Sequence, residues 1–183
     1  MKYAFVVLLS SMVFFCCGDD DAFEHFECEG LIETPITDCD WMDQQYLGLV
    51  FPSKRLDLKW RSDLEAYVFA GFEDSTTTII NLLHYAGHCS DYSDDEWSQF
   101  VFFEIPGGIT SFDYSDEELI DLRCFHRESG AWISTLPVFI TEGRVAGEKI
   151  DDMTWEIAIG ITLPDSTSRG NTCIEYKGGF LVE

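Results

Sequence analysis

Short apolar runs separated by turn residues begin at residue 46 and continue to the end of the chain. The clearest run covers residues 54–60, where Leu56, Leu58 and Trp60 alternate with charged residues. A period of two places the apolar side chains on one face of an extended strand and the charged ones on the other. We therefore predict a strand here, with one face against a core and the other in water.

The same succession of strand, turn and strand extends through the rest of the chain. Further apolar runs cover residues 46–51, 64–72, 97–105, 119–125, 131–134, 138–149, 153–163 and 172–182. Turn residues lie between many of them, at residues 73–75, 106–108, 126–130, 150–152 and 164–170. No amphipathic segment of helical length lies between the runs. The prediction is an all-β fold, an antiparallel meander that forms a single sandwich or barrel of about eight to ten strands.

Residues 76–85 fit two kinds of element. Their threonine and isoleucine content favours a strand. Asp74 or Ser75 is also a suitable cap for a short helix that Gly87 would end. We favour the strand, because the neighbouring runs have the spacing of a β meander and a hairpin joins them naturally.

Residues 1–17 have the character of a secretory signal. Lys2 precedes residues 4–15, which are apolar apart from two serines. This stretch is shorter than the roughly 20 residues that a membrane-spanning helix needs, and it fits the apolar region of a signal peptide. We expect a signal peptide over 1–17, an acidic tether and disulfide-pinned arm over 18–45, and the all-β domain over 46–183.

The end of the signal segment, residues 14–21, reads Phe-Phe-Cys-Cys-Gly-Asp-Asp-Asp. It resembles the N-terminus of bacterial lipoproteins, in which a cysteine after the apolar region is acylated, and more narrowly the Bacteroidota type, in which acidic residues after that cysteine accompany export to the cell surface. The resemblance implies lipidation of Cys17 and a domain anchored at the outer membrane or cell surface. Phe14 and Phe15 depart from the usual lipobox. Cleavage after Gly18 is the alternative, and it gives a soluble secreted or periplasmic protein.

The β-rich remainder of the chain also resembles the small β-rich lipoproteins that are common in Bacteroidota. Many of these have no assigned function, so the resemblance implies a fold and a location and not an activity. It is a resemblance of strand pattern and includes no catalytic motif. A lipoprotein carries several acyl chains, and more than one chain suffices for stable anchoring in a membrane.

The chain contains seven cysteines: Cys16, Cys17, Cys28, Cys39, Cys89, Cys124 and Cys173. Export would place the last five in an oxidising compartment, where disulfides persist. Because five is an odd number, one thiol is expected to stay free or to pair with another molecule. We predict a Cys28–Cys39 disulfide, which brackets a short loop, and leave the pairing among the other three open. No C-x-x-C motif occurs, so neither a zinc knuckle nor a thioredoxin-like motif is indicated.

The charge is strongly negative, with 34 acidic and 11 basic residues and a formal net charge of -23. Such a surface repels phosphate, which excludes nucleic acid as an expected partner and disfavours docking on anionic lipids. Basic residues are absent between Arg61 and Arg123, so the negative charge lies mainly in the tether and one run of loops. A content of 46% hydrophobic residues is ample for a core, which excludes disorder.

Two kinds of metal site are suggested by spacing, and we predict neither. His84, His88 and Cys89 lie close together, but no glutamate follows His84 as zinc-protease chemistry requires. The acidic stretches at residues 38–43, 91–96 and 113–118 offer hard oxygen ligands for calcium, but none has the order of an EF-hand loop. We interpret them as solvated loops.

No motif for nucleophilic catalysis or phosphate binding occurs, and His25 and His126 have no recognisable partners. We therefore predict no catalytic and no cofactor-binding residues. The aromatic residues, which include Trp41, Trp60, Trp97, Trp132 and Trp155, are expected mainly in the core, with a ligand-binding face as the alternative.

The leading hypothesis is a non-enzymatic, lipid-anchored protein that binds an unidentified partner or ligand. A lipocalin-like carrier of a small apolar ligand would instead need a continuous internal cavity. A secreted hydrolase would need two facing carboxylates in one cleft.

Overall fold

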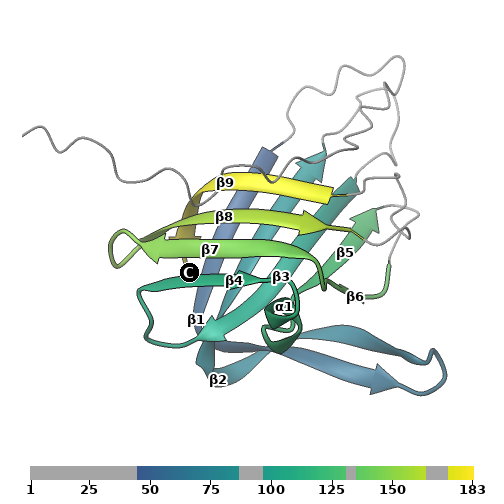
Figure 1. Ribbon diagram of the computed structural model, residues 1–183. Coiled ribbons are helices and arrows are strands. Elements are labelled where there is room, and N and C mark those ends of the chain that lie inside the picture. Colours follow the sequence, from purple (N-terminus) through teal and green to yellow (C-terminus); the bar gives the residue numbers. More distant parts are fainter. Residues whose placement is uncertain (1–44, 87–96, 131–134, 164–172) are drawn as a thin grey trace, which may run out of the picture.

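The computed structural model describes residues 45–86, 97–130, 135–163 and 173–183, and Figure 1 shows their arrangement. These residues form nine strands in one sheet and a single turn of helix. The predicted all-β fold is confirmed, and the number of strands falls in the predicted range. In chain order the elements are β1 (Gln45–Arg61), β2 (Ala66–Ala86), β3 (Trp97–Pro106), β4 (Ser111–Ser115), α1 (Glu118–Asp121), β5 (Phe125–Gly130), β6 (Val138–Phe139), β7 (Gly143–Lys149), β8 (Thr154–Thr162) and β9 (Cys173–Val182).

The strands follow the order β4-β7-β8-β9-β1-β2-β3-β5-β6 across the sheet. Seven of the eight neighbouring pairs among these strands are antiparallel, as expected for a meander. The exception is the parallel pair of β1 and β9, in which residues 48–50 lie beside residues 180–182. This pair joins the first strands of the domain to the last ones, so the sheet is mixed.

The sheet curls until its two ends share one core. The rings of Phe103 on β3 and Phe112 on β4 lie 5.9 Å apart, although five strands separate β3 from β4 in the sheet order. Figure 1 shows β7, β8 and β9 crossing in front of β1, β2 and β3. The face turned toward this core, called here the inner face, carries Val50, Ile80, Leu82, Val101, Phe103, Ile105, Phe112, Val145, Trp155, Ile157, Ile159, Ile161, Ile174 and Phe180.

The opposite side of β2, β3 and β5, called here the outer face, is covered as well. Ile79, Phe102 and Phe125 are buried there together with Leu56 from the distal part of β1. Strands that are covered on both faces read as continuous apolar runs, which explains the unbroken apolar residues 100–103 within the strand predicted at residues 97–105. The two faces therefore hold two separate apolar clusters.

β1 and β2 form one long hairpin that bends midway. Residues 75–77 of β2 stand opposite the single residue Ser53 of β1, because the register shifts between Pro52 and Lys54. Ser53 has a φ of +58°. Extra residues on one strand bend it and increase its twist. The strand predicted for residues 76–85 is thus confirmed, but the turn predicted at residues 73–75 is wrong, since β2 runs through it with a bulge.

The prediction for residues 119–130 was also wrong in part. The segment expected as a strand at 119–125 begins instead with α1, a helical turn that buries Leu119 in the inner core. The turn expected at 126–130 is strand β5. Both errors have a physical cause: four helical residues are too few to show a helical period, and β5 turns the polar residues His126 and Glu128 toward a buried position.

The run predicted as one strand at residues 138–149 is divided into β6 and β7. Gly143 begins β7 with a φ of +124°, and a Cβ atom at this position would clash with the carbonyl oxygen of Gly160. The amide of Gly143 donates a hydrogen bond of 3.0 Å to Oδ1 of Asp116. Glycine is required here by the backbone conformation and by the close approach of β8.

Candidate functional site

The distal half of the β1–β2 hairpin leaves the sheet. We call residues 54–74 the ribbon; it comprises the two strands beyond the bend and the turn that joins them. In Figure 1 the ribbon runs below β5 and β6 and extends beyond them. Its root packs on the outer face: Leu56 is fully buried, and the ring of Phe69 lies 5.1 Å from Phe102 and 5.9 Å from Phe125.

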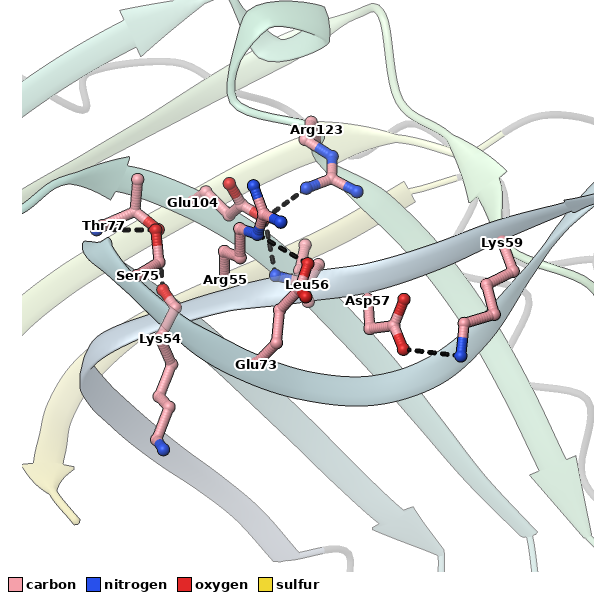
Figure 2. A network of polar contacts seen from close by, with 10 residues as sticks. All are labelled: Lys54, Arg55, Leu56, Asp57, Lys59, Glu73, Ser75, Thr77, Glu104 and Arg123. Atoms are coloured by element: carbon pink, nitrogen blue, oxygen red, sulfur yellow. Dashed lines mark hydrogen bonds and ion pairs between the residues drawn. The ribbon is translucent and has the colours of Figure 1, made fainter.

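A polar network fixes the root of the ribbon to the body, as Figure 2 shows. Oε1 of Glu104 on β3 accepts a hydrogen bond of 2.6 Å from the backbone amide of Leu56 and one of 2.8 Å from Nη1 of Arg123. The Glu104 side chain is only 11% exposed. The hydroxyl of Thr77 donates to the carbonyl oxygen of Lys54 at 2.7 Å. Because charge-assisted hydrogen bonds to a part-buried carboxylate are strong, the ribbon is held in one orientation at its root.

The ribbon neutralises its own charge. Its four basic residues all form ion pairs within the ribbon: Lys54 with Asp74, Arg55 with Glu73, Lys59 with Asp57 and Arg61 with Asp63. Against these four cations stand five acids, the paired four and Glu65, so the formal charge of residues 54–74 is -1. The whole chain carries -23. The ribbon is therefore nearly neutral in a strongly acidic protein, and it presents no unpaired cation.

The apolar side of the ribbon continues beyond the body that covers it. Leu56 is buried and Leu58 half-buried, but Trp60 is 56% exposed. The expectation that Trp60 faces a core is thus wrong. Tyr67 and Leu64 are 41% and 49% exposed. Tyr67 links the group to the body, with its ring 5.2 Å from Trp60 and 5.7 Å from Phe139. Trp60, Leu64 and Tyr67 form what we call the aromatic tip.

A second polar cluster lies on the inner face and joins β2, β3 and β5. Nε2 of Gln99 lies 2.8 Å from Nδ1 of His84, and Oε1 of Gln99 lies 3.4 Å from Nε2 of His126. The ring of Tyr46 stacks on that of His84, with centroids 4.3 Å apart. His84, Gln99, His126 and Glu128 are all buried. His126, for which the sequence indicated no partner, therefore has one in Gln99.

Burial governs the protonation of His126. Removal from water disfavours the imidazolium and lowers the pKa of His126 to about 4, although the nearby Glu128 acts in the opposite direction. His126 is thus neutral at pH 7, and its Nε2 can donate to Gln99. The bridging glutamine gives both histidines a structural role in holding three strands together.

The cysteine predictions fall mainly outside the described residues. Cys17, the expected lipidation site, and Cys28 and Cys39, the expected disulfide, all lie in residues 1–44. Cys124 is a free thiol and is completely buried, and burial raises its pKa to about 12. The alternatives that paired Cys124 with Cys89 or Cys173 are therefore excluded.

The acidic stretch at residues 113–118 has structural partners. Asp113 forms a bidentate ion pair with Arg144: Nε donates to Oδ1 at 2.7 Å and Nη2 donates to Oδ2 at 2.5 Å. Oε2 of Glu118 accepts a hydrogen bond from the amide of Ser115, and Asp116 binds Gly143 as described above. Among the described residues no group of three or more potential ligands is placed to hold a metal ion. The other two acidic stretches, and His88 and Cys89 beside His84, lie outside this part of the chain.

The tryptophans divide between core and surface. Trp155 is buried on the inner face, whereas Trp60 belongs to the exposed aromatic tip. The side chains of Trp41, Trp97 and Trp132 are outside the description. The aromatic tip is the feature that the sequence did not single out. The polar residues 73–75 inside a predicted run of strands were its one local signal, because they lie next to the bend at residues 75–77 that carries the ribbon away from the sheet.

Comparison with known proteins assigns no family to this fold: no family model matches the chain, and neither a curated protein nor a solved structure is significantly similar. No helix in the described ranges has the length and apolar character needed to cross a membrane. The features that bear on function are therefore the two polar clusters, the ribbon and the N-terminal segment that resembles a lipoprotein signal.

Proposed function

We propose that this protein is an exported, lipid-anchored, non-enzymatic binding protein that engages a macromolecular partner through the aromatic tip of its ribbon. The observation that carries the proposal is the exposure of Trp60, Leu64 and Tyr67 at the end of a ribbon whose root is fixed by buried contacts. Large side chains that stay exposed on an ordered element are the usual anchors of protein interfaces.

The composition of the ribbon supports this role. Tryptophan, tyrosine and arginine are the residues that dominate binding energy at interfaces, and the ribbon contains Trp60, Tyr67 and Arg61 within eight positions of one another. The Glu104 network holds the root in place before any partner arrives. Binding by an element that is already ordered loses less conformational entropy than binding by a flexible loop.

The anchoring part of the proposal comes from the sequence. The lipoprotein-like residues around Cys17 support export and acylation, with outer membrane or cell surface as the location. An acidic domain is repelled by anionic headgroups, so the tether would hold it away from the bilayer. In that arrangement the ribbon is available to partners at the surface.

The two alternatives have less support. A lipocalin-like carrier needs an internal cavity, whereas large side chains such as Phe103, Trp155 and Phe180 are buried together on the inner face. A hydrolase needs two facing carboxylates. The part-buried Glu104 is instead bound to Arg123 and to the ribbon backbone.

A photo-crosslinking amino acid at position 60, introduced into the protein in the cells that make it, tests the binding role. We expect irradiation to attach a partner at this position. The same amino acid in place of Met153, which is 62% exposed in the turn between β7 and β8, is the control and should give no adduct. Equal labelling at both positions, or none at position 60, would contradict the proposal.

The anchor is tested separately by mass spectrometry of the mature N-terminus. An acylated Cys17 as the first residue supports it. A free Asp19 would show cleavage after Gly18 and would remove the anchored form, while leaving the binding role of the ribbon intact.

A further inference from the structure

One edge of the ribbon is open to strand pairing. β2 pairs with β3 only over Thr77–Ala86, so its distal part has β1 as its one neighbour within the described chain. No backbone hydrogen bond between described residues reaches this edge from outside the hairpin. The edge strand from Ala66 to Phe69 carries no charge and ends at a bulge, where Ala70 is the extra residue between Phe69 and Gly71.

Several other edges are protected. The β1 strand of the ribbon carries a charged residue at five of its eight positions from Lys54 to Arg61, and its Leu56 amide is bound to Glu104. At the two ends of the sheet, β6 is only two residues long, and β4 is five residues long with Asp113 paired to Arg144. Charges and short length are the usual means by which proteins prevent edge pairing. The edge at Ala66–Phe69 is also short, but it carries no charge.

We propose that the uncharged edge Ala66–Phe69, together with the aromatic tip, pairs with the same surface of a second copy of this chain. Two ribbons related by a two-fold axis would join edge to edge as antiparallel strands, and each aromatic tip would be covered by the other. This inference rests on the binding role proposed for the ribbon, and it names the partner.

Charge favours a second copy over a charged partner. The ribbon carries a formal charge of -1, against -22 for the rest of the chain, so two such molecules repel each other weakly at the ribbon. Its four cations are already paired internally, which leaves backbone groups and aromatic rings as the contacts on offer. An isologous interface needs a surface that complements itself, and an uncharged strand edge does so.

The contact is small. Three large side chains and a four-residue edge fall below the surface area that permanent dimers bury, so association in dilute solution is expected to be weak and reversible. Copies that share one membrane would meet at a much higher effective concentration than free molecules. A weak contact between ribbons would therefore operate mainly on anchored copies.

The test is sedimentation equilibrium of the mature chain with Cys17→Ser, which prevents association through acyl chains. We expect a monomer–dimer equilibrium at up to about 1 mM protein. Raising the salt concentration from about 0.1 M to about 1 M should strengthen the dimer, because screening reduces the repulsion between the two acidic bodies. A monomer under all these conditions, or a dimer that weakens with salt, would overturn the inference.

The matched variants are Val68→Glu and Ser62→Glu. Val68 lies opposite Lys59, so a glutamate there suits the hairpin but puts a charge in the edge strand. It should weaken dimerisation at least about tenfold, whereas Ser62→Glu adds the same charge in the turn and should weaken it much less. Equal effects of the two variants would overturn the edge as the contact. Circular dichroism confirms that both variants are folded.

The two proposals can fail separately. If position 60 crosslinks to a different protein while the purified chain stays monomeric, the binding role stands and the second-copy inference falls. If crosslinking at position 60 gives a dimer that Val68→Glu abolishes, both are supported. Flotation with vesicles of uncharged phosphatidylcholine tests whether the aromatic tip binds a lipid surface instead. If the chain carrying Cys17→Ser floats and Trp60→Ala abolishes this, the tip docks on lipid and the inference is overturned.

Discussion

The two halves of the β1–β2 hairpin are built from the same two strands but occupy different environments. In the half before Ser53, β1 lies between β9 and β2, and the part of β2 paired with it lies between β1 and β3. Beyond Ser53 the two strands have only each other as sheet neighbours among the residues that the structure describes. The first half is part of a core, whereas the second half is held by one buried root and by polar contacts. Because both halves share the same strand pairing, we expect a difference in their stability to follow the number of covered faces.

The largest difference between the halves should appear when one aromatic residue is removed from each. Phe103→Ala on the inner face deletes a ring that is fully buried, and we expect the free energy of unfolding to fall by about 3–5 kcal/mol. Trp60→Ala removes a ring that is more than half exposed and should cost below about 1 kcal/mol. Urea denaturation of both variants measures this. Similar losses would show that the tip is packed like a core.

The second effect is the loss of stability at low pH in the body half of the hairpin. There β2 contributes His84 to the polar cluster that Gln99 bridges. The pKa of His126 is about 4 in the folded protein, below its ordinary value of 6.5, so the unfolded chain binds the proton first as the pH falls. Stability is therefore lost between pH 6.5 and pH 4, by about 3 kcal/mol in total, and the loss is complete below pH 4. His126→Gln keeps a donor for Gln99 and should lack this component.

The measurement is the free energy of unfolding of both proteins from pH 7 to pH 4. Carboxylates titrate in the wild type and in the variant alike, so the difference between the two curves isolates the histidine. Parallel curves would mean that His126 is already protonated in the folded state or is accessible to water.

The third effect concerns the junction between the halves. Glu104→Ala removes the acceptor of the Leu56 amide and the partner of Arg123, and we expect a loss of about 2–3 kcal/mol. Glu104→Gln keeps an acceptor oxygen for Leu56 but not the charge, so it should cost less. Hydrogen exchange at the Leu56 amide reports on the ribbon directly. Faster exchange in the alanine variant with an unchanged body would show that the ribbon root detaches by itself.

The smallest effect is expected at the surface of the ribbon. Asp74→Asn breaks the ion pair between Asp74 and Lys54, in which the Asp74 side chain is 93% exposed. Exposed ion pairs contribute little, so the midpoint of urea denaturation should not change measurably. A clear decrease would indicate that the ion pairs of the ribbon act together and would weaken the contrast with the buried Glu104.

The residue pattern predicted much of the hairpin and failed at identifiable places. Alternation at residues 54–60 gave a correct strand, and the threonine and isoleucine content of residues 76–85 gave another. β5 was missed because its inward positions hold His126 and Glu128, polar residues that are buried and that hide the apolar alternation. The bend at residues 75–77 was mistaken for a turn at residues 73–75 because polar residues signal both features.

The sequence could predict the residues of the candidate site but not their exposure or their pairing. The sequence shows that Trp60 follows Leu56 and Leu58 at a spacing of two, which indicates a shared face. Whether that face is covered depends on how far the body extends over the ribbon, and β6 ends after two residues. The neutral charge of the ribbon is countable from the sequence, but the pairing of Lys54 with Asp74 and of Arg55 with Glu73 requires the hairpin register.

The sequence by itself determined that this chain forms an all-β domain, that it is strongly acidic, and that its N-terminal segment resembles that of a lipoprotein. These properties depend on local periodicity and composition, which a single chain displays directly. Only the tertiary structure decided that β1 and β9 run parallel, that Gln99 bridges two histidines, and that a ribbon leaves the sheet with Trp60 exposed. Those features depend on contacts between residues far apart in the chain, and such contacts leave no periodic signal in any one segment.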